Sequence, residues 1–196
     1  MSAEEHSEEH FKQHYSDSYL QAKSRFENLE RKFSRNPKVK EQYVPSSQLH
    51  ECKYFLPHHC VLKEESSSTK LRVVFNGSAV TSSRFSLNAL LMSGPTIQAK
   101  LFTTLVRFRT FPIGTTGDVC KMYRCARVQE PVSLLQCILW RDSPKDDILV
   151  CKLDTVTYGT KPASFLAIRA MQQLAMDGSS SYPLGSKVVL RDFKPF

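Results

Sequence analysis

The sequence has no apolar leader at its N-terminus and no apolar run near the ~20 residues that a helix needs to cross a bilayer. Its six cysteines include no Cys-x-x-Cys pair, so a secreted disulfide framework is not expected. No internal repeat and no low-complexity array is present. These absences predict an intracellular protein, cytoplasmic or nuclear, with free thiols and no membrane partner.

The charge that is present is unevenly spread along the chain. Residues 1–17 hold five acidic residues and one lysine, which gives this segment a net charge of −4. Since the whole chain has a net charge of +8, the remaining residues carry +12. A basic body of this kind suits a partner with a phosphate backbone. At 196 residues and 41% hydrophobic content, the chain is long enough for one domain with a core and a helical appendage.

The N-terminal third divides into three segments. Residues 1–17 are polar and lack a buried pattern, which predicts a disordered acidic tail. Apolar residues then recur at helical spacing over residues 18–34, and Asn36-Pro37 ends this amphipathic helix. Its basic face is interpreted as the solvated side of a packing helix, with contact to nucleic acid or to a membrane surface as the alternative. The pattern of residues 38–51 predicts a linker. Residues 18–52 are therefore grouped as an N-terminal segment that consists of the helix and this linker.

Residues 53–196 mix strand and helix patterns. We expect a β-hairpin over 54–75 that ends in the turn Asn76-Gly77-Ser78, and a helix over 96–109. The later elements are expected to be a strand into Asp118, strands near 134–140 and 148–153, a helix over 162–176 and a final strand over 188–193. This order favours an α+β fold with helices packed on one sheet.

Asp118 stands five residues before Tyr123, just after an apolar segment. Taken alone, this pair also fits an ordinary strand-end Asp followed by a core Tyr. Four further blocks fall around it in order: YFLPHHCVLKEESSSTKLRVVFNGSA, SLNALLMSGPTIQ, QCILWR and TVTYGTKPASFLAIRAMQQLA. Together with the upstream FENLERKFSRNPKVKEQY, they resemble the reverse transcriptases of Bel/Pao-type long-terminal-repeat retrotransposons over most of residues 25–193.

The resemblance implies the fingers and part of the palm of a right-hand polymerase over residues 53–196, with an incomplete palm sheet. It implies an RNA-directed DNA polymerase family that binds RNA or DNA template-primer and dNTP, and Mg2+ as the cofactor. Asp118 and the Val119 carbonyl are implied to bind the metal, and Tyr123 to lie under the incoming sugar and screen its 2'-OH. Gly159 is implied to let the nucleotide approach the backbone closely.

Two cations of the expected hairpin complete the implied site. Arg72 is the better candidate for a forked contact with the triphosphate, and Lys63 is the second cation. Solvated strand-edge charges are the alternative interpretation of both residues. The chain departs from the family at Asn76, where Asp is usual, and at 162–165, where Pro does not directly precede Phe.

Two of the three catalytic carboxylates of the family are missing. In the family a Tyr-x-Asp-Asp turn follows Arg-Asp-Phe, but here Arg191-Asp192-Phe193 is followed by residues 194–196, which read KPF. A lone Asp118 cannot position the two Mg2+ ions of nucleotidyl transfer. We therefore expect a truncated, inactive fragment with weak or absent Mg2+ binding and an unpaired strand edge over 188–193.

Two other functions stay open at this stage. One is a non-catalytic, basic nucleic-acid-binding remnant or domesticated protein. The other is a zinc-stabilised module, since a group of His and Cys residues falls within eleven positions, although its spacing is irregular for zinc. The members of this group are His50, Cys52, His58, His59 and Cys60. The sequence identifies no protein partner.

Overall fold

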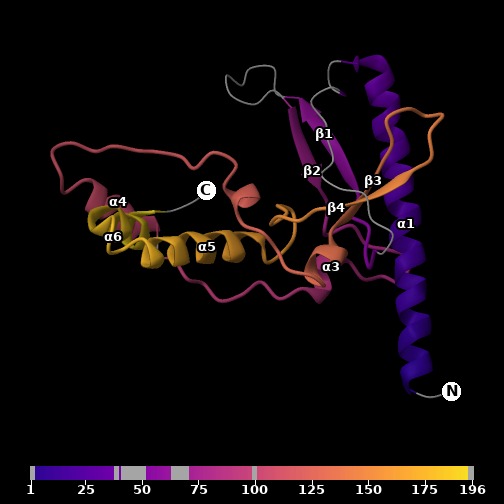
Figure 1. Cartoon of the computed structure of the whole chain (residues 1–196), viewed down its shortest axis with the longest axis horizontal. Coiled ribbons are helices and arrows are strands. Elements are labelled where there is room, and N and C mark those ends of the chain that lie inside the picture. Colours follow the sequence, from indigo (N-terminus) through magenta and orange to yellow (C-terminus); the bar gives the residue numbers. More distant parts are fainter. Residues whose placement is uncertain (1–2, 38–39, 41–51, 63–70, 99–100, 194–196) are drawn as a thin grey trace.

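The computed structural model describes residues 3–37, 40, 52–62, 71–98 and 101–193, with side chains from residue 16 onward. The expected linker over 38–51 lies almost wholly outside these residues. Two regions stand on either side of the short helix α3 (Leu87–Leu90) (Figure 1). The core region comprises residues 16–35, 52–62, 71–75 and 137–152, and the helical region comprises residues 101–108 and 163–192.

Helix α1 (Ala3–Arg35) lies along one side of the core region (Figure 1). It confirms the helix expected over 18–34 and ends at Arg35, directly before Asn36-Pro37. It begins earlier than expected, however, because residues 3–17 are helical rather than unstructured. That segment contains no Gly or Pro and has four Glu residues, a residue type with good helix propensity. Its acidic composition was therefore a poor argument for disorder.

Strands β1 (His58–Leu62) and β2 (Leu71–Phe75) pair antiparallel, with His58 opposite Phe75. The expected hairpin strands are thus confirmed, while their connection over 63–70 lies outside the described residues. The turn at 76–78 is also confirmed, since the Ser78 N–H donates to Asn76 Oδ1 (3.2 Å). The apolar run at 54–56 does not extend β1.

A second antiparallel pair is formed by β3 (Cys137–Trp140) and β4 (Leu149–Lys152). Both strands were expected, but a 3-10 helix, η2 (Val132–Leu135), replaces the start of the first. The described strands form two two-stranded sheets, not the single sheet predicted from the sequence. Residues 54–56 connect the two, because Phe55 bridges Cys137 and the Leu56 N–H donates to the Cys137 carbonyl (2.7 Å).

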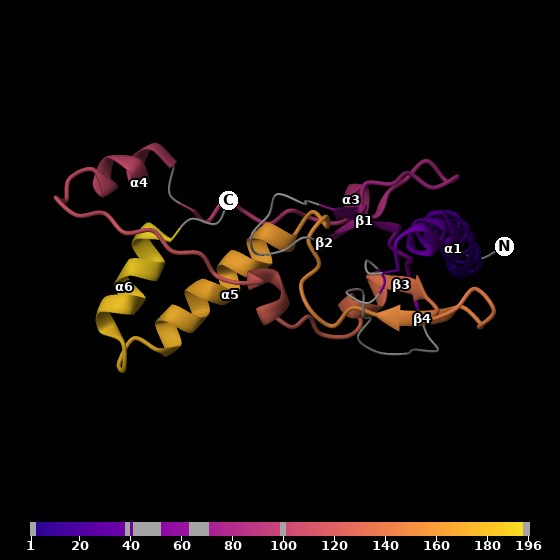
Figure 2. The same ribbon diagram turned by 90° about the horizontal axis from the view of Figure 1, so that it is seen from above.

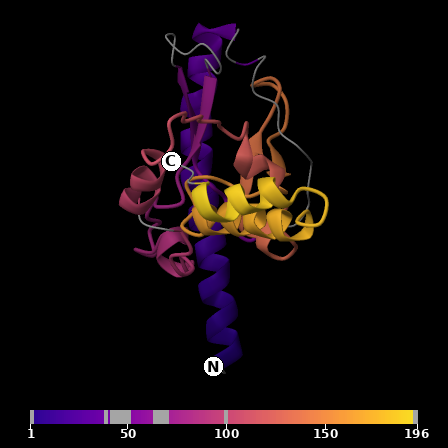
Figure 3. The ribbon, with the colours of Figure 1, turned by 90° about the vertical axis from the view of Figure 1, so that its left-hand side faces the viewer.

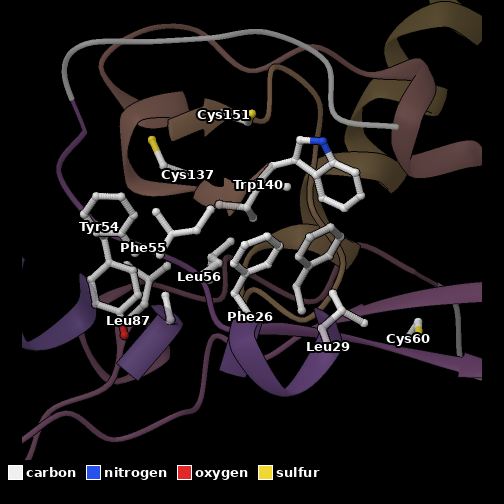
Figure 4. Close-up of a cluster of buried hydrophobic side chains, with 14 of the residues drawn as sticks. Phe26, Leu29, Tyr54, Phe55, Leu56, Cys60, Leu87, Cys137, Trp140 and Cys151 are labelled. Carbon is white, nitrogen blue, oxygen red and sulfur yellow. The ribbon is translucent and has the colours of Figure 1, made fainter. Parts of the chain in front are cut away.

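The hydrophobic core fills the space between α1 and the two sheets (Figures 2 and 4). One stripe of α1 faces it, and Phe26 on this stripe is fully buried. The rings of Phe26 and Phe33 contact Trp140 of β3, with centroids 6.1 and 5.9 Å apart. Full burial of each such side chain stabilises the fold by ~1.5–3 kcal/mol. The core therefore fixes α1 against β1 and β3.

The helical region lies on the side away from α1 (Figures 1 and 3). It contains α4 (Leu101–Phe108), α5 (Ala163–Asp177) and α6 (Pro183–Asp192). The helix expected over 162–176 is confirmed, and α4 occupies part of the helix expected over 96–109. Position 94 packs tightly here, since a Cβ on Gly94 would lie 2.5 Å from the Phe165 ring of α5.

The strand predicted over 188–193 is wrong, because residues 183–192 form α6. Pro183 stands at the start of this helix, where its fixed φ favours helical continuation. Arg107 of α4 further holds α6, through an ion pair with Asp192 (3.1 Å). The unpaired strand edge expected at this position is therefore also wrong.

Candidate functional site

Gly159 lies against the end of β2, at a position where only glycine fits. Its φ of +89° is in the left-handed region, which glycine adopts without steric cost. A Cβ at this position would collide with the Phe75 carbonyl oxygen. On its other side, the Gly159 carbonyl lies 2.8 Å from where a Cβ of Gly77 would be. The turn at 158–159 and the end of β2 are thus in direct backbone contact.

Asn88 of α3 holds these two backbones together. Its Nδ2 donates to the Gly159 carbonyl (3.0 Å) and to Ser78 Oγ (2.8 Å), and its Oδ1 accepts from the Lys161 N–H (2.7 Å). Its own N–H donates to the Gly77 carbonyl (2.8 Å). Asn88 therefore uses backbone and side chain to fix the loop over 158–161 against the turn after β2.

Tyr123 reaches the same place from the 3-10 helix η1 (Met122–Cys125). Its ring stands edge-on to Tyr158, with centroids 6.3 Å apart, and its hydroxyl lies 3.3 Å from Ser164 Oγ in the first turn of α5. Lys121, directly before η1, has a left-handed φ of 52° that turns the chain into this helix. Tyr123 is half-buried.

Tyr158 connects Tyr123 to β2. Its ring packs on Phe75 with centroids 5.2 Å apart, and its hydroxyl donates to the Val73 carbonyl at the free edge of the strand. Burial raises the pKa of the Tyr158 hydroxyl above its ordinary value, so the group stays a neutral donor. The result is a junction of β2, α3, η1 and the 158–161 loop, which we call the tyrosine junction.

Of the residues that the resemblance assigns to one nucleotide site, Tyr123 and Gly159 are at the tyrosine junction. Arg72 is on β2, one residue from Val73, and its side chain is exposed. Lys63 lies outside the described residues. The departure at 162–165 is accommodated, since α5 begins directly after Pro162 and presents Ser164 to Tyr123.

Asp118 is exposed and belongs to an irregular segment, so the strand expected to lead into it is wrong. Pro112, Gly114 and Gly117 precede it, and these residue types disfavour a strand. The Val119 carbonyl accepts a hydrogen bond from the Met122 N–H (3.3 Å), which closes the turn into η1. This carbonyl therefore already has one protein partner.

The residues around Asp118 do not fit a two-ion centre. In the part of the chain that the structure describes, no three His, Cys, Asp or Glu side chains gather where they could hold a metal ion. Asp192 is instead bound to Arg191 and Arg107, which together hold the pKa of its carboxyl below the usual value. The residues of the alternative zinc group are not gathered either, as far as the structure describes them: β1 directs His59 outward while His58 and Cys60 are buried, and His50 lies outside the described residues.

Three residues of the junction were missed as site residues from the sequence: Asn88, Tyr158 and Ser164. All three lie inside the quoted blocks, and Tyr158 directly precedes Gly159. Their roles depend on contacts across 41 to 85 positions of sequence, between Tyr123 and Ser164, Asn88 and Gly159, and Tyr158 and Val73. No local pattern specifies such contacts.

No family model, curated protein or solved structure matches this chain. Among the described residues, no helix has both the length and the apolar composition for a membrane span. A function can therefore be proposed only from the geometry of the tyrosine junction and from the resemblance of the sequence blocks.

Proposed function

We propose that this chain is a reverse transcriptase-derived protein that binds a template-primer and a deoxynucleoside triphosphate at the tyrosine junction. One observation carries the proposal. The resemblance assigns Tyr123, Gly159 and Arg72 to one nucleotide site, although 36 positions separate Tyr123 from Gly159 and 51 separate it from Arg72. In the structure, Tyr158 and Asn88 join the segments that carry them.

Each group has a separate role in the proposed binding. The Tyr123 ring, held between Tyr158 and Ser164, supports the sugar and rejects a 2'-OH. Gly159 presents bare backbone. Arg72, exposed as the second residue of β2, contacts the phosphates with its guanidinium fork. These roles need no bound metal.

The Arg72 contact gives the direct test. Arg72→Ala is expected to weaken dNTP binding to the protein–template-primer complex by at least tenfold, since a hydrogen bond to a charged group contributes ~1.5–3 kcal/mol. Arg109→Ala is the matched control, because Arg109 is also exposed but follows α4. Titration of fluorescent dNTP measures both. Equal affinities for the two variants would contradict the proposed site.

A second candidate, non-catalytic binding of nucleic acid, is favoured by the charge pattern of α1. Arg25, Asn28, Lys32 and Arg35 recur at helical spacing and are exposed, with Arg31 beside them. The stripe on the other side of the buried face contains Glu27 and Glu30, and Glu30 pairs with Arg141 (2.7 Å). The two flanks of α1 thus differ in charge. On the basic flank Lys32 Nζ donates to the Cys60 carbonyl (2.8 Å), while Arg25, Arg31 and Arg35 are exposed and can meet a phosphate backbone.

Salt dependence distinguishes this candidate. If the basic flank binds duplex DNA or RNA, Arg31→Gln combined with Arg35→Gln should weaken binding and lower the slope of log affinity against log salt by about 1 for each phosphate that the protein ceases to neutralise. Lys23→Gln removes one charge from the opposite flank and should leave the slope unchanged. An unaltered slope in the Arg31/Arg35 variant would remove α1 from the binding surface.

A further inference from the structure

Two thiols far apart in sequence meet at one backbone carbonyl. The Sγ atoms of Cys52 and Cys137 lie 3.9 and 3.5 Å from the Leu134 carbonyl oxygen, and the Cys52 thiol also donates to the Tyr54 carbonyl (3.3 Å). Cys137 is fully buried, whereas Cys52 is partly exposed. Solvent therefore reaches the pair from the Cys52 side.

The backbone holds the two cysteines in this arrangement. The N–H groups of Lys53 and Tyr54 donate to the Leu134 carbonyl (2.8 and 3.2 Å), and the Cys137 N–H donates to the Tyr54 carbonyl (3.2 Å). A disulfide requires its two Cα atoms to be within about 7 Å of each other and its side chains to converge. Two sulfurs that lie at the same carbonyl oxygen, on segments joined by backbone hydrogen bonds, are close to that geometry.

The two thiols differ in acidity. Their mutual interaction lowers the pKa of the Cys137 thiol, with the positive charge of Lys152 acting in the same direction, and raises the pKa of the Cys52 thiol. The thiolate is the form of cysteine that reacts with oxidants. By contrast, burial raises the pKa of Cys151 to about 11. Cys151 stands on the neighbouring strand, and its sulfur does not converge with that of Cys137 (Figure 4).

We propose that Cys52 and Cys137 are a redox modification site, which a peroxide converts into a reversible disulfide. The thiolate of the pair attacks hydrogen peroxide: an S–O bond forms, the O–O bond breaks and hydroxide leaves, giving a sulfenic acid. The second thiol then displaces the sulfenic oxygen, which leaves as water, and the S–S bond forms. The two sulfurs lose two electrons in total and the peroxide gains them. A dithiol reductant reverses the reaction.

The disulfide would tie the segment before β1 to the first residue of β3. These two segments are otherwise connected by hydrogen bonds and by the bridge between Phe55 and Cys137. Restricting the unfolded chain in this way stabilises the folded state. Oxidation should therefore raise the denaturation midpoint reported by Trp140, which is three residues from Cys137 and is the only tryptophan of the chain.

The test is mass mapping of the full chain after one equivalent of hydrogen peroxide and blocking of the remaining thiols. We expect a linked peptide pair that contains Cys52 and Cys137, lighter by two hydrogen atoms and released by a dithiol. Cys52→Ser should abolish both the link and the midpoint shift, while Cys125→Ser, at an exposed thiol, should abolish neither.

Two outcomes would overturn the proposal. One is a link between other cysteines, such as Cys120 and Cys125, in place of the Cys52–Cys137 link. The other is oxidation of Cys52 to sulfinic acid with Cys137 still free. Because Cys52 is partly exposed, the Cys52→Ser variant should fold, which Trp140 fluorescence checks independently of any nucleotide binding.

Discussion

The core region and the helical region each contain an amphipathic helix, but the apolar face of the first helix is buried and that of the second is exposed. Phe26 of α1 is 0% exposed, whereas Phe102 of α4 is 76% exposed. No residue of α4 is buried, and Leu184 of α6 is also exposed. The difference shows that an apolar stripe specifies a helix, while a facing partner decides whether the stripe contributes stability.

The largest expected effect tests this difference directly. Phe26→Ala should lower the free energy of unfolding by about 3–5 kcal/mol, because it removes a buried ring and leaves a cavity against Trp140. Phe102→Ala is the matched change in the helical region and should stay within about 0.5 kcal/mol. Chemical denaturation followed by circular dichroism measures both. Similar losses would mean that α4 is packed as firmly as α1.

The next effect is a pH dependence confined to the core region. Burial lowers the pKa of His58 to about 4 from the ordinary value of 6.5. Below pH 6.5 the unfolded chain binds a proton that the folded chain takes up only near pH 4. The contribution of neutral His58 to the free energy of unfolding is therefore complete above pH 6.5. It falls by ~3 kcal/mol as the pH drops to 4.

Denaturation midpoints read from Trp140 across this pH range measure the loss. His58→Met should flatten the dependence between pH 6.5 and 4, while His59→Asn, on the exposed face of β1, should leave it in place. A steep dependence that persists in His58→Met would assign the effect to another group.

A smaller effect is expected at the tyrosine junction, between the two regions. Gly159→Ala should cost about 1–3 kcal/mol, since the new Cβ meets the Phe75 carbonyl and the backbone has a positive φ. Gly117→Ala is the matched control, because no atom lies within 4 Å of its added Cβ. If Gly159→Ala unfolds at the same denaturant concentration as Gly117→Ala, the close approach of the two backbones is not present.

The smallest effect concerns the connection of α4 to α6. Asp192→Asn removes the partly exposed ion pair with Arg107 and should cost about 0.2–1 kcal/mol. Asp147→Asn, at an exposed position between β3 and β4, provides the comparison. High salt should reduce the difference between the two variants. A loss from Asp192→Asn as large as that from Phe26→Ala would show that this pair, and not apolar packing, holds the helical region.

Local patterns predicted the elements that carry clear periodicity. The stripe of Phe26, Leu29 and Phe33 identified α1, and the β-rich run at 71–75 identified β2. The apolar run at 188–190 was misassigned because three residues do not distinguish a strand from a helix, and Pro183 with the Arg107 contact decided for α6. Composition likewise misled at residues 3–17, where helix propensity prevailed over charge.

The candidate site was only partly accessible to sequence reasoning. The motifs around Tyr123 and Gly159 predicted a site that contains both residues. Asn88 was not, because its role is four hydrogen bonds to two distant segments and no spacing rule encodes them. The expected strand into Asp118 failed for a related reason: the sequence suggested an element that has no described partner strand beside it.

The central claim is that the tyrosine junction binds a deoxynucleotide with Tyr123 beneath the sugar. The most direct measurement compares the affinities for dNTP and for the matching ribonucleotide in Tyr123→Ala and in Tyr123→Phe. Tyr123→Phe keeps the ring and should prefer dNTP as the original chain does, whereas Tyr123→Ala should bind both nucleotides alike. Unchanged preference in Tyr123→Ala, or no preference in the original chain, would contradict the claim.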